Sequence, residues 1–175
     1  MATRTLPTTN GAFVPIGTQE PILRSDSREI SLLVADENLS LTYASRAAGE
    51  RVADPHVHRH TEAFYVLEGE LAFQVGAECE TITIDAGGFV AVPPGVAHSF
   101  RTAGGHPARW LIIHVGDGGF AAFMRGVRDG VKVDWDIAPV PMDGGLPADH
   151  AIVSRPSCEP PPEGNASSLS EPFLR

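Results

Sequence analysis

The stretch P-H-V-H-R-H-T-E-A-F-Y-V-L-E-G-E, residues 55–70, carries the densest chemistry in the chain. Alternate side chains of an extended chain point to the same face, so His56 and His58 can converge on one ion. Glu62 follows four residues later and can join them. These residues supply two nitrogen ligands and one oxygen ligand, and we therefore expect a metal site here.

A second stretch, G-G-F-V-A-V-P-P-G-V-A-H-S-F at residues 87–100, offers His98 after a Pro-Pro-Gly turn as a fourth ligand. An isolated H-x-H is more often a pair of ordinary surface histidines than a metal site. The added carboxylate and the second histidine cluster favour the metal, because three imidazoles and one carboxylate suit divalent transition metals. His60 is a rival ligand, since its position has the same parity as His56 and His58.

The two stretches resemble the two signature motifs of the cupin superfamily, G-x5-H-x-H-x3,4-E-x6-G and G-x5-P-x-G-x2-H-x3-N. The first motif is matched, with six residues instead of five after its first glycine, by Gly49, His56, His58, Glu62 and Gly69. The second is matched, with Thr102 where the pattern has Asn, by Gly87, Pro93, Gly95 and His98. The resemblance covers about residues 28–116, and neither departure affects a ligand.

The resemblance implies an all-β fold, the cupin double-stranded β-helix or jelly-roll barrel. It also favours Glu62 over His60 as the carboxylate-position ligand, because the motif leaves three residues between the second histidine and the glutamate. The layout further resembles bacterial single-domain quercetin-dioxygenase-like cupins. In that case Glu62 is both a metal ligand and a candidate catalytic residue.

Hydrophobic patterning agrees with an all-β chain. Short runs rich in branched and aliphatic residues, separated by turn residues, predict strands at 29–35, 39–47, 62–76 (broken at 68–69), 80–84, 89–92, 98–102 and 108–115. Strands this short and regularly spaced are typical of a sandwich or barrel. We expect an N-terminal arm at 1–27, one cupin barrel at 28–140 and a proline-rich, mobile tail at 141–175.

After the last predicted strand the apolar period changes from that of a strand to that of a helix. Phe120, Phe123, Met124 and Val127 recur at i, i+3, i+4 and i+7, which predicts a short C-terminal helix at about 117–129 with Asp117 as a cap. Such a stripe usually packs in a core. The alternative is that it forms a lid over the barrel mouth.

Composition limits the possible partners. The chain has 175 residues, 42% of them hydrophobic and 20% charged, which predicts one globular domain. The net charge of −9 and the lack of a basic stripe argue against nucleic acid. Without a long apolar run or a secretory signal, we expect no membrane contact and a cytoplasmic location. Cys79 and Cys158 have no metal-binding or redox spacing and are expected to be reduced thiols.

The site would hold one divalent transition metal ion, which could be iron, manganese, nickel, cobalt or zinc. Its small-molecule substrate would meet a partly aromatic pocket formed by Phe64, Phe73, Phe100, His114 and Phe123. The resemblance implies a dioxygenase-type oxidoreductase acting on a small aromatic or enolic, flavonol-like compound. The alternatives are a zinc isomerase or cyclase acting on a polyketide-like or sugar-like substrate, and a non-catalytic ligand-binding protein. The family also implies a homodimer, with the arm packed on the partner.

Overall fold

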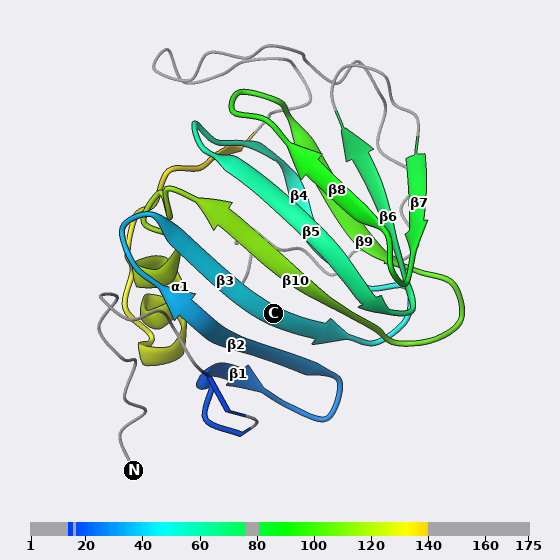
Figure 1. Ribbon diagram of the computed structural model, residues 1–175, viewed down its shortest axis with the longest axis horizontal. Helices are drawn as coiled ribbons and strands as arrows, with labels where there is room; N and C mark the ends of the chain where they lie inside the picture. The colour runs from blue at the N-terminus through cyan, green and yellow to red at the C-terminus, as the bar shows by residue number, and fades with distance from the viewer. Residues whose placement is uncertain (1–13, 16, 76–80, 140–175) are drawn as a thin grey trace.

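The computed structural model describes residues 14, 15, 17–75 and 81–139 of the chain. These residues form two facing layers of antiparallel strands and a short helix (Figure 1). The elements, in chain order, are β1 Glu20–Arg24, β2 Arg28–Ala35, β3 Leu39–Arg46, β4 Arg51–Val57, β5 Thr61–Glu68, β6 Glu70–Val75, β7 Thr81–Asp85, β8 Phe89–Val92, β9 His98–Ala103, β10 Ala108–Val115, α1 Phe120–Asp129 and β11 Ala138–Pro139.

From β4 onward, consecutive strands alternate between the two sheets, except that β6 and β7 pair with each other in one sheet. One sheet has the order β1-β2-β3-β10-β5-β8, and the other has the order β11-β4-β9-β6-β7. This is the arrangement of a jelly roll, so the predicted all-β cupin architecture with a C-terminal helix is confirmed.

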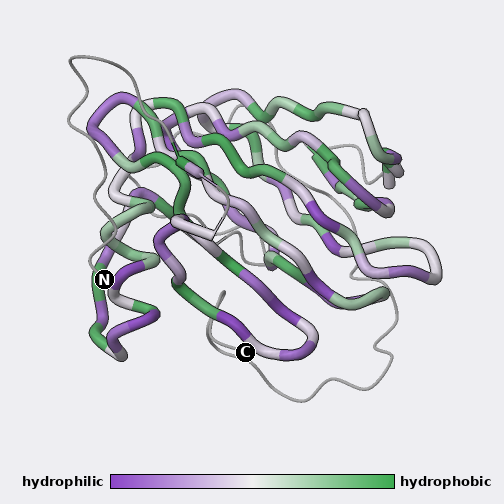
Figure 2. The backbone as a smooth tube through the Cα atoms, turned by 60° about the horizontal axis from the view of Figure 1, so that its bottom comes forward, coloured by the Kyte–Doolittle hydropathy of each residue, from purple (hydrophilic) through white to green (hydrophobic). Residues whose placement is uncertain are grey.

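Inward-facing and outward-facing residues alternate along the strands, as a two-layer β structure requires. Along β3 every second residue, from Ser40 to Arg46, is buried, and along β10 the same is true from Ala108 to His114. The register places His114 opposite Ser40 on one side and opposite Glu62 on the other. Figure 2 shows the matching alternation of apolar and polar segments along the backbone.

The interior divides into two apolar clusters. The larger lies between the two sheets and centres on the stacked rings of Phe64, Phe73 and Phe100, with Trp110 at its edge. The smaller lies between α1 and the first two strands, and its buried members are Ile22, Ile30, Leu32, Phe120, Ala121 and Met124. The helix thus covers the part of the longer sheet that the shorter sheet leaves open, and its apolar stripe is core.

The helix begins after a run of residues with positive φ. Its N-cap is Gly119, and Asp117, the predicted cap, contributes from outside by accepting a hydrogen bond from the Ala121 N–H at 3.1 Å. Glu20 at the start of β1 binds Arg125 and Arg128 of the helix, each at 2.8 Å. The strand β1, which the sequence did not predict inside the segment 1–27, is therefore fastened to α1.

The strands that were predicted match the structure closely, and 108–115 coincides with β10, whereas β4 and β11 were also not predicted. The glycine of the first motif that ends β5, Gly69, has φ 71°, and a Cβ there would lie 2.5 Å from the Pro107 carbonyl oxygen. Only glycine fits this turn without strain. The proline-rich tail, most of the arm and both cysteines lie outside the described residues. Within those residues, no helix is both long and apolar enough to cross a membrane.

Candidate metal centre

Four buried side chains from different parts of the chain converge between the two sheets. His56 on β4 and His98 on β9 are register partners in the shorter sheet, whereas Glu62 lies on β5 of the longer sheet. His58 lies in the turn between β4 and β5. The ligand atoms of the four residues all lie within 4.8 Å of one another, so the predicted ligands form one group that could hold a metal ion.

The route by which Glu62 reaches the group differs from the expected one. Strand parity was expected to bring it to the face of His56 and His58, but β4 ends at Val57 and the chain bends before β5 begins at Thr61. Glu62 therefore approaches from the facing sheet. The ion would be held between the two layers and not on one face of a single strand.

The Glu62 carboxylate is the centre of the group. Its Oε2 lies 2.8 Å from His98 Nε2, 2.9 Å from His58 Nε2 and 3.9 Å from His56 Nε2. Ligands about 2.1 Å from one ion and at right angles are about 3.0 Å apart. The two short separations therefore match neighbouring ligands of a single ion.

The other ring nitrogen of each histidine is held by the backbone. The Nδ1–H groups of His56, His58 and His98 donate to the carbonyl oxygens of Asp54 at 2.7 Å, His60 at 2.8 Å and Val96 at 3.1 Å respectively. A carbonyl can only accept, so each Nδ1 carries a proton. A ring without a second proton directs its Nε2 lone pair toward Glu62. Three nitrogen lone pairs and a carboxylate facing one another need a cation between them.

The protonation states suit metal binding. Burial, reinforced by the neighbouring His98, lowers the pKa of His56 to about 3, so its imidazole is neutral at ordinary pH. Burial alone would raise the pKa of Glu62, but His114 and the imidazoles of His58 and His98 outweigh it and hold that pKa well below its usual range. Neutral imidazole and ionised carboxylate are the forms that bind divalent metals. The donor set contains no thiolate, and it fits a divalent transition metal.

His60, the rival ligand, lies outside this group. The chain bends at residues 59–60, which takes the ring away from the other histidines' meeting point. Its Nε2 lies 2.8 Å from His114 Nδ1, and its Nδ1 lies 3.3 Å from Asp136 Oδ2. His114 in turn places its Nε2 3.5 Å from Glu62 Oε1. The two histidines thus link a carboxylate of the metal group to a second carboxylate outside it.

His60 and His114 carry too few protons for every contact in this link to be a hydrogen bond. Burial lowers the pKa of His60, and it lowers the pKa of His114 to about 3, so both rings are neutral. Each neutral ring carries one proton, whereas the two rings make three contacts: with Asp136, with each other and with Glu62. If His60 donates to Asp136, then His114 donates to His60 and its Nε2 is left as an acceptor. This arrangement suits the Asp136 carboxylate, which can only accept when it is ionised.

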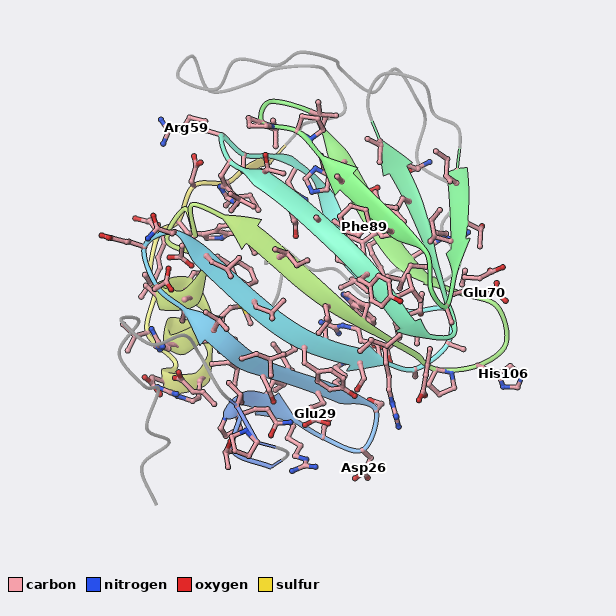
Figure 3. The ribbon with its side chains drawn as sticks, in the orientation of Figure 1. Asp26, Glu29, Arg59, Glu70, Phe89 and His106 are labelled. Atoms are coloured by element: carbon pink, nitrogen blue, oxygen red, sulfur yellow. The ribbon has the colours of Figure 1, made fainter. Side chains whose placement is uncertain are left out.

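The segment after α1 forms one wall of the site, and the sequence did not predict it. The Trp135 ring lies 6.4 Å from the ring of His58 and 5.8 Å from that of His114. Asp136 accepts from both the backbone N–H and the guanidinium of Arg59, at 2.9 and 2.7 Å (Figure 3 labels Arg59 at the end of its turn). A single tryptophan and an aspartate in a short segment carry no motif that could have identified them.

Gly118 explains how His60 can lie so close to the start of the helix. It has φ 59°, and a Cβ there would clash with the His60 ring. A side chain at this position would displace His60 from Asp136 and His114. Gly118 is therefore a packing requirement of the site.

The predicted pocket residues fall into two groups. Phe64 and Phe100 lie two residues beyond Glu62 and His98 on the same strand faces, and with Phe73 they form a fully buried layer next to the metal group. His114 is buried beside Glu62, as described. Phe123 is partly buried and stacks on Trp135, with ring centroids 5.4 Å apart. Their contact with a substrate stays a prediction.

The comparison with known families agrees with the two motifs. Residues 43–114, which contain all four ligands of the metal group, match the family model described as the cupin domain. No curated protein sequence matches the chain significantly.

Several solved structures are similar in fold. An RmlC-like cupin from Shewanella frigidimarina shares 21% identity over 59% of this chain and 89% of its own, with a TM-score of 0.48. An RmlC-like cupin from Methanocaldococcus jannaschii shares 15% identity over 52% and 82%, with a TM-score of 0.47. The polyketide cyclase RemF from Streptomyces resistomycificus shares 22% over 56% and 74%, with a TM-score of 0.46.

None of these similarities singles out the quercetin-dioxygenase-like cupins, so that finer resemblance stays a prediction. The superfamily itself rests on firmer ground, because the matched domain carries both motifs and their ligands converge inside a jelly roll. Residues 43–114 of the chain match the cupin domain, in a fold of the cupin type.

Proposed function

We propose that the protein is a metal-dependent single-domain cupin that acts as a dioxygenase-type oxidoreductase on a small aromatic or enolic compound. The observation that carries the proposal is the convergence of three Nε2 lone pairs on a buried carboxylate, with every Nδ1–H already engaged by a backbone carbonyl. Hydrogen bonds of this kind to the second ring nitrogen fix the orientation of metal-binding histidines.

His56, His58, Glu62 and His98 would hold one divalent ion. When bound by four protein ligands, such an ion supplies Lewis acidity and open coordination positions, and iron, manganese, nickel or cobalt adds redox chemistry. Dioxygen would be the co-substrate, and both of its atoms would enter the product, so the reaction needs no separate reductant.

The surroundings of the four ligands support a largely apolar substrate. Phe64 and Phe100 form the layer beyond the ligands, and Phe120 stacks on His114 with ring centroids 4.0 Å apart. Trp135 closes the side of the site next to His58. These rings would pack on a flat, unsaturated compound and limit water near the ion.

The donor set itself favours one second candidate. Zinc is held equally well by imidazoles and a carboxylate, and it performs no redox chemistry. A zinc-loaded protein would polarise a substrate carbonyl, which suits the isomerisation or cyclisation of a polyketide-like or sugar-like compound.

The two functions are distinguished by metal analysis of protein purified without added metal, combined with oxygen uptake on a panel of flavonols and catechols. Iron, manganese, nickel or cobalt together with uptake supports the dioxygenase, and zinc without uptake supports the alternative. His98→Ala should lose both metal and activity. His106→Ala is the matched control, because His106 is exposed in the β9–β10 loop (Figure 3) and should leave both unchanged.

Protein that carries no stoichiometric metal and binds none on addition would contradict both enzyme assignments. That result would leave a barrel that binds a small ligand without catalysis, the third function considered from the sequence.

A further inference from the structure

Three buried polar atoms without a hydrogen-bond partner lie beside the metal group. They are Ser40 Oγ and Thr42 Oγ1 of β3 and Nε2 of His114 on β10, and within the described part of the chain none of them has a partner that meets hydrogen-bond geometry. All three side chains are fully buried, with 0% of their surface exposed. We call these three residues the polar seam.

The polar seam runs along the boundary between the two apolar clusters. Ser40 is the register partner of His114, and Thr42 follows it on the same face of β3. Apolar residues flank the seam, with Ile112 opposite Thr42 and with Phe120 stacked on His114. Polar residues at three adjacent inward positions explain why the interior is not one continuous apolar core.

Leaving these atoms unpaired is costly. A buried polar group without a partner destabilises a protein by about 1–3 kcal/mol, and nearly all such groups in native proteins are paired with protein, water or ligand. Three of them side by side, next to four converging metal ligands, indicate a place that another molecule completes.

The polar seam presents both kinds of hydrogen-bonding group. Ser40 and Thr42 carry hydroxyls, which can donate, whereas His114 offers Nε2 as an acceptor when its Nδ1 donates to His60. A hydroxyl group on a ligand can accept from one of the two hydroxyls and donate to the other, whereas the His114 Nε2 faces the metal group, 3.5 Å from Glu62 Oε1. A group that only accepts or only donates would satisfy the seam in part.

The distance from the metal group defines the position of that hydroxyl. Neighbouring strands are about 4.8 Å apart, so β3 lies about 10 Å from β5, which carries Glu62. His114 lies between them on β10, with its Nε2 3.5 Å from Glu62 Oε1. Beside it, Ile112 of the same strand and Phe120, which stacks on His114, are apolar and buried. A ligand that reaches from the ion to the seam therefore needs an apolar, flat body with oxygen functions at its two ends.

We propose that the Ser40 and Thr42 hydroxyls of the polar seam bind a hydroxyl group at the end of the substrate remote from the metal, which makes the substrate a phenol with metal-binding oxygens elsewhere. The inference rests on the proposed metal centre and narrows the aromatic substrate class to hydroxylated compounds. Ser40 and Thr42 are specificity-determining residues, and they do not hold the metal.

The test uses two redox-stable chelators that differ only in a remote hydroxyl, benzohydroxamate and 4-hydroxybenzohydroxamate. Their dissociation constants are measured by calorimetric titration on the full-length chain loaded with Co²⁺. Two hydrogen bonds to the added hydroxyl should make the wild-type protein prefer the 4-hydroxy compound by about tenfold.

Four variants show which residues cause the preference for the 4-hydroxy compound. Thr42→Val and Ser40→Ala should each lose most of it while leaving the affinity for benzohydroxamate and the cobalt content unchanged. Thr42→Ser, which restores the hydroxyl, should keep it. Ser45→Ala is the matched control, since Ser45 lies on the same strand with its side chain toward the other face of the sheet.

Equal binding of the two hydroxamates to the wild type would overturn the seam proposal, because the seam would then hold internal water only. The proposed metal centre would be unaffected by that result. A preference that persists in both Thr42→Val and Ser40→Ala would also overturn it. If neither chelator binds cobalt-loaded protein, the proposed metal function itself fails, and this inference fails with it.

Discussion

Thr102 stands where the second cupin motif has asparagine, and the structure shows what the threonine does. Its hydroxyl donates to the Ala47 carbonyl oxygen at 2.7 Å and accepts from the Glu50 N–H at 2.8 Å. Its own backbone N–H donates to the Glu50 carbonyl at 2.9 Å. The loop that leads into β4, and so to His56, is thereby fastened to β9.

Replacing Thr102 by valine keeps the size and shape of the side chain and removes only the hydroxyl. The side chain is fully buried, so water cannot replace the lost partner. The orphaned Glu50 N–H should cost about 1–3 kcal/mol, and the lost bond to Ala47 about 0.5–1.5 kcal/mol. We expect Thr102→Val to lower the free energy of unfolding by about 2–4 kcal/mol.

Thr42 provides a matched control inside the same protein. It too is a fully buried threonine on a strand, but its hydroxyl has no partner in the described residues. Thr42→Val should therefore be neutral or should stabilise the ligand-free protein by up to about 1 kcal/mol, because it removes an unpaired polar group.

Urea denaturation of the two variants and the wild type measures both effects. At a slope of about 2 kcal/mol/M, the midpoint of Thr102→Val should fall by about 1–2 M, and that of Thr42→Val should stay or rise. The reasoning is refuted if the two substitutions have the same effect, because burial alone would then explain the result. A drop for Thr42→Val alone would show that the seam hydroxyl has a structural partner.

Four further predictions test the rest of the structure. His98→Ala should remove most of the bound metal, whereas His60→Ala should keep it, as measured by elemental analysis; loss in the second variant would make His60 a ligand. Glu20→Gln should cost about 1 kcal/mol at pH 7, because the pKa of Glu20 is lowered chiefly by its hydrogen bond to Arg125 and the partly exposed partners weaken the pair. That difference should vanish as the pH falls below the ordinary value of 4.5 and through the lowered pKa, and a difference independent of pH would exclude the ion pair as its cause. Gly118→Ala should shift the ¹⁵N resonances of the His60 ring, and an unchanged spectrum would show that the helix start adapts. A chain beginning at Glu20 keeps every described strand but should form a weaker homodimer in sedimentation, and a full-length monomer at micromolar concentration would rule the dimer out.

Much of the barrel could be predicted because its signals are local. Strand β10 is a run of mostly large and branched residues whose ends are set by Pro107 and Gly116, and it was predicted to the residue. The strand β1 was missed because its five residues, E-P-I-L-R, include a proline and two charges. The charge of Glu20 is satisfied by a helix about a hundred residues later, which no local pattern indicates.

The spacing of the cupin motifs is a better guide to the metal ligands than the strand parity that first suggested them. Parity on a single strand pointed to His56 and His58, but the structure brings Glu62 from the other sheet after a bend. The extra residue before His56, a departure from the motif, is absorbed by β-bulges in β4 that restore the pairing of His56 with His98. Spacing in the motif therefore records a three-dimensional arrangement that strand geometry alone does not contain.

The environment of the site is less predictable than its ligands, because it is built by residues that touch them only after the chain returns. Trp135 and Asp136 lie more than seventy residues after His60, yet one packs on its ring and the other faces its Nδ1. Their position depends on where α1 ends and on the positive φ of Gly118 at its start. A metal-binding motif specifies which atoms hold an ion, whereas the substrate that can approach it is decided by such distant segments. Two cupins with the same four ligands can therefore differ in chemistry when the segment after the helix differs.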